Sequence, residues 1–390
     1  MTYPSRRAGL GVLLAVSALL ATAAQGPART EKPEPWVRAW GSNAAGQLGN
    51  GATLDQQTPS AIRGLARDDV RELAAAGSFA VALLNNGTVQ AWGSNTRGQL
   101  GDGTTAPRTY PAAVAGLSGV SRVTAGFVSA YAVRNGRVLA WGHNAYGQLG
   151  NGNTAAGTDP PTSRPVPVQG LNKVKSIAAG CDHVAALRDD GSVWTWGRNN
   201  AGQLGIGSTT DSNTPKRVAG LQDAVALAAG CNHTVALTAD GTVKTWGSNV
   251  SGQLGNGTTT GSPVPVNVQH LTDVAGVFTG SHHNFALLHD GTLRAWGRND
   301  AGQLGDGTKT NRTTPVPLPE LAGVKAVAGG WDHTLAVLDD QSVVAWGGNA
   351  LGQLGDGTTT PSLSPVTALP AGSGTTRVAA TNERESSFAY

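Results

Sequence analysis

The 390-residue chain has little of several residue types, and each shortage argues against a class of protein. Only 14% of the residues are charged, and they form no concentrated basic stripe of the kind that nucleic-acid binders carry. We therefore expect no nucleic-acid partner. Apart from one run near the N-terminus, no apolar segment approaches the roughly 20 residues of a membrane-spanning helix. We expect no membrane span, and the lack of a long amphipathic pattern argues against an α-helical fold.

Residues 1–23 have the pattern of an export signal. Arg6 and Arg7 are followed by an apolar run from Leu10 to Leu20 and by the small residues Ala21-Thr22-Ala23. Without this segment the net charge falls from +3 to +1. The pattern predicts a secreted protein, extracellular or periplasmic, in which residues 24–35 form a short disordered lead.

Glycine, proline and tryptophan are plentiful, with 55, 20 and 10 copies, and most of the tryptophans belong to one repeat. The pattern W-G-x-N-x-x-G-Q-L-G-x-G occurs seven times, at intervals of 49–55 residues. Its tryptophans are Trp40, Trp92, Trp141, Trp196, Trp246, Trp296 and Trp346. A repeat with a period near 50 residues indicates a solenoid or propeller, in which each unit stacks on its neighbours to bury an apolar face.

Each repeat contains four short strand patterns, and this predicts an all-β, seven-bladed propeller over residues 36–390, which we expect to be a monomer. The proline-marked strand, as in Thr214-Pro215-Lys216-Arg217-Val218, should be peripheral because proline is tolerated on edge strands. Dipeptides between the second and third strands predict type I′ hairpins. They are Asn86-Gly87, Asn135-Gly136, Asp190-Gly191, Asp240-Gly241 and Asp290-Gly291, whereas Asp340-Gln341 predicts a looser hairpin.

The two ends of the chain complement each other. The C-terminal segment resembles the first two strands of a blade, and Trp36–Trp40 resembles the third strand that this blade lacks. We therefore expect the N-terminal strand to pair with the C-terminal strands and close the ring, which would remove exposed sheet edges.

A second repeated pattern, G-x-x-H, places histidines at His183, His233, His283 and His333. Zinc requires its ligands at ~2.0–2.1 Å in a tetrahedron, and residues spread around a seven-fold ring do not easily converge in that way. We expect no metal or cofactor at these positions. Each imidazole should instead hold together the loops of its own blade through hydrogen bonds.

Together, W-G-x-N-x-x-G-Q-L-G-x-G and A-A-G-x-x-H-x-x-A-L resemble the regulator-of-chromosome-condensation repeat family over residues 36–390. The resemblance implies a seven-bladed propeller, and the signal segment suggests a secreted bacterial-type member. The eukaryotic founder of the family is a guanine-nucleotide-exchange factor, a nuclear role that an export signal contradicts. A secreted bacterial β-lactamase inhibitor of this fold binds its target through aromatic residues in the loops between Gly and His.

That resemblance implies a set of partner-binding positions in the same loops of this chain. They are Phe79, Phe127, Asp182, Asn232, His282, Trp331 and Asp332. They are sparsely aromatic, so the protein or other extracellular ligand that they would bind is not identified.

No local motif assembles a nucleophile with a base, so we expect no enzyme. The leading hypothesis is a secreted scaffold that binds a protein or ligand through one propeller face. The alternative is an extracellular propeller hydrolase or lyase, which would need a deep axial pocket with perturbed acids or histidines. An exchange factor is a distant third.

The only cysteines, Cys181 and Cys231, occupy the same slot of consecutive repeats, near the expected central channel. A disulfide requires Cα atoms about 4.4–6.8 Å apart, and an oxidising compartment would allow it to form. The other interpretation is a pair of small buried thiols.

Overall fold

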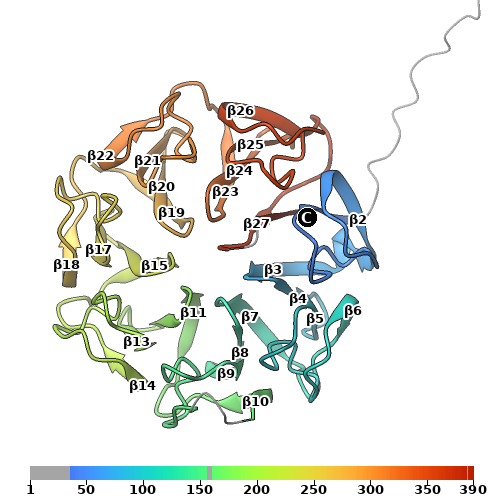
Figure 1. Ribbon diagram of the computed structural model, residues 1–390. Helices are drawn as coiled ribbons and strands as arrows, with labels where there is room; N and C mark the ends of the chain where they lie inside the picture. Colours follow the sequence, from blue (N-terminus) through green and yellow to red (C-terminus); the bar gives the residue numbers. More distant parts are fainter. Residues whose placement is uncertain (1–35, 156–159, 384) are drawn as a thin grey trace, which may run out of the picture. The chain divides into compact units, whose positions relative to one another are not determined.

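The computed structural model describes residues 36–155, 160–383 and 385–390, and they form seven four-stranded antiparallel sheets arranged in a ring (Figure 1). Blades 1 to 6 follow the chain as β3–β6, β7–β10, β11–β14, β15–β18, β19–β22 and β23–β26. Blade 7 is built from both ends of the ring, in the order β27, β28, β1, β2. The fold class predicted from the repeats is confirmed, and the predictions for residues 1–35 lie outside the described residues.

The strands occupy four concentric positions. The innermost strands are β3 (Val70–Ala76), β7 (Val120–Ala125), β11 (Val174–Ala179), β15 (Ala224–Ala229), β19 (Val274–Thr279), β23 (Val324–Gly329) and β27 (Val378–Ala380). The second strands are β4 (Phe79–Leu84), β8 (Ser129–Arg134), β12 (His183–Arg188), β16 (His233–Thr238), β20 (His283–Leu288), β24 (His333–Leu338) and β28 (Ser386–Ala389). The third strands are β1 (Trp36–Gly41), β5 (Val89–Gly93), β9 (Arg137–Gly142), β13 (Val193–Gly197), β17 (Val243–Gly247), β21 (Leu293–Gly297) and β25 (Val343–Gly347).

The outermost strands carry the predicted prolines. They are β2 (Gln56–Ala66), β6 (Arg108–Ala113), β10 (Thr162–Pro167), β14 (Ser212–Arg217), β18 (Ser262–Asn267), β22 (Arg312–Pro317) and β26 (Ser362–Leu369). One short 3-10 helix, η1 (Arg67–Asp69), precedes β3. Within the described ranges, no helix is long and apolar enough to cross a membrane.

The ring closes as the two chain ends predict. Strand β1 pairs with β28 in a continuous antiparallel register from Arg38 opposite Ala389 to Gly41 opposite Ser386. Strand β28 therefore lies between β27 and β1 in the sheet of blade 7. The hydrogen bonds between β28 and β1 join the first and last repeats, so neither of these two strands presents an unpaired edge.

The hydrophobic core lies between neighbouring blades. Trp141 of blade 2, for example, is buried in one cluster with Phe79, Val81 and Leu83 of blade 1. All seven repeat tryptophans are 0% exposed, and each indole N–H donates to the main-chain oxygen of the repeat glutamine in the preceding blade. Each repeat therefore satisfies the polar atom of its largest apolar side chain through its neighbour, as a buried indole requires.

The other residues of the repeat shape the loop that receives this tryptophan. Asn199 donates through Nδ2 to the carbonyls of Ser208 and Thr210, both at 2.9 Å, and accepts from the amide of Leu204. Gly205 has a φ of +67°, and a Cβ there would lie 2.7 Å from the indole nitrogen of Trp246. Only glycine allows both the left-handed turn and this close approach.

The hairpins differ from the predicted type I′ turns in all blades but one. Only Asn135 and Gly136 both have positive φ, as a type I′ turn requires. In blades 1 and 3 to 6 the loop has three residues: in blade 3, for example, the amide of Arg188 donates to the carbonyl of Ser192, and Gly191 alone takes the left-handed conformation. This is the type I turn followed by a left-handed residue. Gln341 adopts a φ of 67° and keeps the same hydrogen bonds, so that hairpin is not looser.

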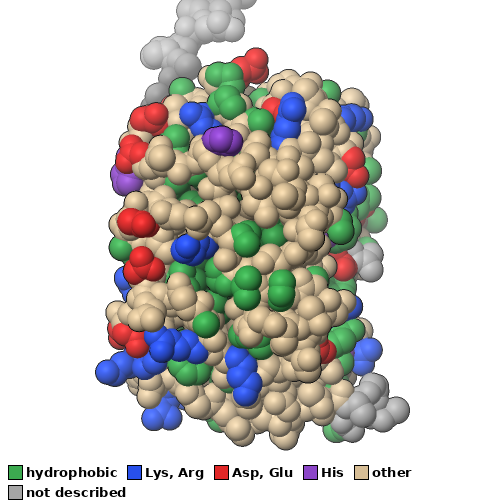
Figure 2. All heavy atoms as spheres, turned by 90° about the vertical axis from the view of Figure 1, so that its left-hand side faces the viewer, with side chains coloured by type: hydrophobic (Ala, Val, Ile, Leu, Met, Phe, Trp, Pro, Cys, Tyr) green, Lys and Arg blue, Asp and Glu red, His purple; other side chains and the backbone are tan. Residues whose placement is uncertain are grey.

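The outer wall shows no extended strip of one charge on the side drawn in Figure 2, where acidic and basic side chains are both scattered among polar ones. Apolar side chains form small separate patches there. Val264 on β18 and Val250 in the loop before it are among the exposed large apolar residues of blade 4. Isolated residues of this kind are normal on a protein surface, so the described residues on this side of the wall form no obvious site.

Candidate binding face at one mouth of the ring

Two sets of loops gather at one end of the ring, which we call the mouth face. They are the G-x-x-H loops between first and second strands and the W-G-x-N loops between third and fourth strands. Because neighbouring strands are antiparallel, the end of β11, the start of β12 and the end of β13 lie at the same end of blade 3. The hairpins between second and third strands lie at the opposite end, the hairpin face.

The mouth is narrowed by hydrogen bonds between equivalent loops of successive blades. The amide of Phe127 donates to Cys181, that of Cys181 to Cys231, and that of Cys231 to Ser281, over 2.8–3.3 Å. Ser281 donates in turn to Gly330 at 2.9 Å. This first loop position therefore lies close to the axis, and neighbouring copies nearly touch.

The closeness of these loops brings the two cysteines together. Cys181 and Cys231 form a disulfide, with Cα atoms 4.5 Å apart and a sequence separation of 50 residues. Their separation lies within the range that a disulfide allows. The bridge joins blade 3 to blade 4 beside the axis.

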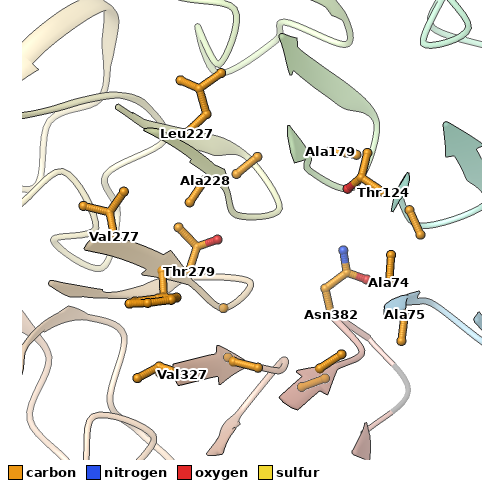
Figure 3. Close-up of a pocket in the computed structure, with 18 residues that line it drawn as sticks. Ala74, Ala75, Thr124, Ala179, Leu227, Ala228, Val277, Thr279, Val327 and Asn382 are labelled. Atoms are coloured by element: carbon orange, nitrogen blue, oxygen red, sulfur yellow. The ribbon is translucent and has the colours of Figure 1, made fainter. Parts of the chain in front are cut away.

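Behind the mouth, the inner strands of all seven blades enclose an axial cavity of about 310 Å³ (Figure 3). Its walls consist largely of alanine, glycine and valine, with Thr124, Thr279 and Asn382 as polar side chains. Asn382 also accepts a hydrogen bond from Ser281 through its main-chain oxygen and one from the amide of Gly77 through Oδ1. No acid, histidine or cysteine is among the described residues that line the cavity.

The repeated histidines join neighbouring blades, which corrects the expectation that each would tie its own blade together. Nε2 of His183 lies 2.9 Å from Oγ1 of Thr234 in blade 4, and Nε2 of His333 lies 3.0 Å from Oγ of Ser387 in blade 7. Each of these histidines lies at the start of a second strand, close to the axis, where the gap between blades is narrow. Its side chain therefore reaches the next blade rather than the loops of its own blade. His233 and His283 make the equivalent contacts, with Asn284 and Thr334.

The partner atoms fix the tautomer of these histidines. Ser387 Oγ donates to the carbonyl of Gln353 at 2.8 Å, so it must accept from Nε2–H of His333. Nδ1 is then left with a lone pair, and it has no hydrogen-bond partner among the described residues. Burial lowers the pKa of His183 to about 3 and that of His233 and His333 to about 4, so these rings are neutral near pH 7.

The structure places the predicted partner-binding residues unequally. Phe127, Asp182, Asn232, His282, Trp331 and Asp332 lie half-buried in the mouth-face loops. Phe79 does not: it is 0% exposed, pairs with Gly93 as His183 pairs with Gly197, and therefore occupies the histidine slot. The loop has the same length as in blade 3, but Ala76 stands at the position of Gly180, and an apolar ring replaces the imidazole in the core. Phe79 cannot contact a partner.

Asp182 forms the centre of one polar group on this face. Its carboxylate lies 3.5 Å from the guanidinium of Arg198 and accepts from Nε2 of Gln148 at 3.3 Å. Arg198 also lies over the ring of Tyr146, 4.7 Å from its centroid. Burial raises the pKa of Asp182, while Arg198 and His143 oppose the shift. This aspartate is therefore paired within the mouth face.

Trp331 forms the centre of an aromatic group at the junction of blades 5 and 6. Its ring meets His282 edge to face with centroids 5.0 Å apart, and the guanidinium of Arg298 lies 5.7 Å from it. Arg298 is held in turn by Asp300 at 2.8 Å. We call Trp331, His282 and Arg298 the aromatic cluster.

Asp332 meets a second carboxylate rather than an arginine. Glu385 of blade 7 faces it, and Nε2 of Gln353 donates to both carboxyl groups. Burial and the neighbouring Asp332 raise the pKa of Glu385 to about 9. The sequence analysis missed Glu385, although it precedes Ser386 in the strand copy that aligns with the Asp-His pairs. It also missed Arg198 and Arg298, which share the position after W-G.

The architecture is that of a propeller built from W-G-x-N-x-x-G-Q-L-G repeats, closed by a composite blade. The model of the RCC1-like domain family matches residues 34–276 and 156–390, and the chain belongs to this family. Similar curated proteins include the ultraviolet-B receptor UVR8 of Arabidopsis thaliana, 32% identical over 43% of this chain and 27% of the receptor. Human E3 ubiquitin-protein ligase HERC2 is also 32% identical, over 43% of this chain and 4% of the ligase.

Solved structures show the same fold at low identity. Human WBSCR16 superposes with a TM-score of 0.80 at 22% identity, covering 91% of this chain and 98% of that one. Prp20p of Saccharomyces cerevisiae, described together with its binding to Gsp1p and histones, gives a TM-score of 0.78 at 24% identity, covering 92% of each chain. The matches to the curated relatives span about a quarter of their length or less. These relatives are eukaryotic, so a bacterial-type origin remains a prediction.

Proposed function

We propose that this chain is an exported scaffold that binds a partner protein through the mouth face. The observation that carries the proposal is the aromatic cluster, in which a half-buried tryptophan, a histidine and an arginine lie together in the loops of that face. Tryptophan and arginine are the residues most enriched in binding hot spots. Relatives of the family support protein binding, as the interaction of Prp20p with Gsp1p and histones illustrates for that protein.

A pull-down from culture medium with the immobilised full chain tests the proposed surface. We expect Trp331→Ala to weaken capture of the partner at least about tenfold, because loss of a hot-spot side chain costs ~1.4 kcal/mol or more. Trp194→Ala is the matched control: Trp194 is also half-buried but lies on β13, where Arg188 and Ser192 of the hairpin region contact it. Equal loss in both variants would show that the mouth face is not the binding surface.

Export is a separate part of the proposal and has its own test. It rests on the pattern in residues 1–23, and the Cys181–Cys231 bridge supports it because disulfides persist in oxidising compartments. Expression in the native host should give a product outside the cytoplasm whose N-terminus begins after residue 23. A full-length product confined to the cytoplasm would contradict export without affecting the surface test.

The alternative, an extracellular hydrolase or lyase, requires perturbed acids or histidines in a deep axial pocket. The described lining of the axial cavity has neither, and Glu385, whose pKa is raised, lies elsewhere, between blades 6 and 7. A nucleotide-exchange role conflicts with the predicted export. We therefore keep the binding scaffold as the proposed function.

A further inference from the structure

Three potential metal ligands converge where blade 6 meets the closing blade 7. Asp332 and His333 come from the mouth loop of blade 6, and Glu385 comes from the equivalent loop of blade 7. One ligand atom from each of the three lies within 4.8 Å of the other two. A shift of an ångström or so for each side chain would bring them to the distances of about 2.0–2.2 Å at which imidazole and carboxylate bind zinc.

The histidine of this group is prepared for such a role. His333 is 0% exposed, its Nε2–H is committed to Ser387, and its Nδ1 keeps a lone pair without a partner among the described residues. Metal-ligating histidines commonly donate their other ring N–H to a protein acceptor, which fixes the tautomer and the orientation of the ring. Ser387 is placed to do this.

The other buried histidines show what is particular to this junction. His183, His233 and His283 also have an unpartnered Nδ1, so the lone pair alone does not define a site. His183 even follows an aspartate, but Asp182 is paired with Arg198. In the described part of the chain, only His333 stands beside two carboxylates that could ligate with it.

The side chains around the two carboxylates favour a bound cation. Position 348, which corresponds to Arg198 in blade 3, is glycine, and a Cβ there would lie 2.3 Å from Oδ2 of Asp332. The carboxylate thus occupies the space that an arginine stem would need. Gln353 donates to Asp332 and Glu385 together and holds both carboxyl groups toward one point. When both groups are ionised, the two facing carboxylates repel each other unless a cation lies between them.

We propose that Asp332, His333 and Glu385 bind a divalent first-row transition metal, of which zinc is the representative, across the junction of blades 6 and 7. One imidazole and two carboxylates suit such an ion better than magnesium or calcium, which prefer all-oxygen sites. Because the ligands come from both blades, the ion joins the last complete repeat to the composite blade, at a junction without a disulfide. The three ligands share no residue with the aromatic cluster, although Asp332 directly follows Trp331 in the same loop.

Zinc titration of the full chain, stripped with EDTA and desalted, tests the site by calorimetry and by thermal unfolding. We expect one equivalent of Zn²⁺ to bind and to raise the melting temperature, because a ligand that binds only the folded state stabilises it. Glu385→Gln and Asp332→Asn should each weaken binding at least about tenfold. Calcium and magnesium should bind much more weakly than zinc.

Two further variants distinguish this site from general binding to acidic loops. Asp182→Asn changes the equivalent aspartate of blade 3 and should leave zinc affinity and the melting shift as in the wild type. Gly348→Arg supplies the arginine that blade 3 has and should abolish zinc binding while the apo chain stays folded, as checked by circular dichroism. The proposal is overturned if the stripped wild type binds no zinc, if Asp182→Asn lowers affinity as much as Asp332→Asn, or if calcium binds as tightly as zinc.

Discussion

The junction between blades 3 and 4 and the junction between blades 6 and 7 share one backbone design but differ in charge. In both, an Asp-His loop sends a neutral histidine into the next blade, to Thr234 in one case and to Ser387 in the other. At the first junction an arginine pairs with the aspartate and a disulfide crosslinks the blades. At the second, no arginine pairs with the aspartate, Glu385 adds a second carboxyl group, and only noncovalent contacts close the ring.

The difference shows that two sets of residues occupy separate positions of the repeat. One set, which we call the frame, holds the blades together, and the other can differ from one junction to the next. Tryptophan, asparagine, glutamine and glycine hold the blades together in the same way around the ring. The side chains at the two positions before the histidine and at the position after W-G do not take part in that frame, so they vary from blade to blade. A property unique to one junction should therefore reside in these positions, and the following variants test it.

The largest expected effect comes from removing the tryptophan at each junction. Trp40 donates to Gln353 across the closing junction, and Trp246 donates to Gln203 across the crosslinked one. Replacing either fully buried indole with alanine should cost about 3–5 kcal/mol of unfolding free energy, measured by urea denaturation. Hydrogen exchange should separate the two, because Trp40→Ala frees β1 and β28, whereas the disulfide keeps blades 3 and 4 together in Trp246→Ala.

Reduction provides the control for this pair. With the disulfide reduced, the region around Trp246→Ala should exchange as fast as the closing blade of Trp40→Ala. If both junctions exchange alike while the disulfide is intact, the contrast between crosslinked and noncovalent junctions is wrong.

Loss of the disulfide should have the next largest effect. The bond closes a loop with a sequence separation of 50 residues, and its removal in Cys181→Ser/Cys231→Ser should cost about 2–4 kcal/mol of unfolding free energy. Reductant should destabilise the wild type by a similar amount and leave the double variant unchanged. Two titratable thiols in the denatured, unreduced chain would show that the bridge does not form.

The charge at the closing junction predicts a pH dependence. Glu385 has a pKa raised to about 9, compared with an ordinary value of 4.5, because of burial and Asp332. The folded chain therefore holds a proton that the unfolded chain loses, so the stabilisation is complete below about pH 4.5 and is lost as the pH rises toward about 9. In EDTA, the stability of the wild type relative to Glu385→Gln should fall by roughly 1 kcal/mol per pH unit between about pH 5 and pH 8.

The buried histidines do not obscure this measurement. Their pKa values are lowered by burial, so their contribution to folding stability is complete above about pH 6.5 and is lost as the pH falls. This pH dependence is opposite in sign to that of Glu385. The wild type and Glu385→Gln share all of them, and the difference between the two proteins cancels their effect. A difference that stays constant with pH would show that Glu385 is not protonated in the folded chain.

The frame could be predicted from the sequence because it repeats. Seven copies of one pattern determine blade number, strand order and, through the missing strand at Trp36–Trp40, the closure. The predicted type I′ turn holds for Asn135-Gly136 and fails for the other four dipeptides, because Asn-Gly and Asp-Gly fit both a two-residue and a three-residue loop and only the strand register distinguishes them. The sequence predicts histidine contacts within one blade because the distance between blades at the axis is not visible in a linear sequence.

The candidate sites were predictable only in part, because they depend on contacts between blades. The mouth-face positions followed from the resemblance, but Phe79 fell in the core because one residue of register separates a loop position from a strand position. The partners of Asp182 and Asp332 lie in other loops, 16 and 53 residues further along the chain. No local pattern joins Asp332 to Glu385, since only ring closure brings them together.

The smallest expected effect compares the two aspartates directly. Asp182→Asn removes one partner of Arg198, an ion pair at 3.5 Å in which the arginine side chain is 33% exposed, so it should destabilise the chain by no more than ~1 kcal/mol. Asp332→Asn removes a negative charge that faces Glu385, so the same change should stabilise the metal-free chain by a similar amount. The measurement is urea unfolding in EDTA at about pH 10, above the raised pKa of Glu385, with Asp223→Asn, on an exposed loop of the hairpin face, as the control for a neutral surface change. The two effects should have opposite signs because the loops share a backbone and differ only in the residue that faces the carboxylate. Loss of stability in both variants would mean that Asp332 already has a cationic partner in the folded chain, and the contrast between the two junctions would then disappear.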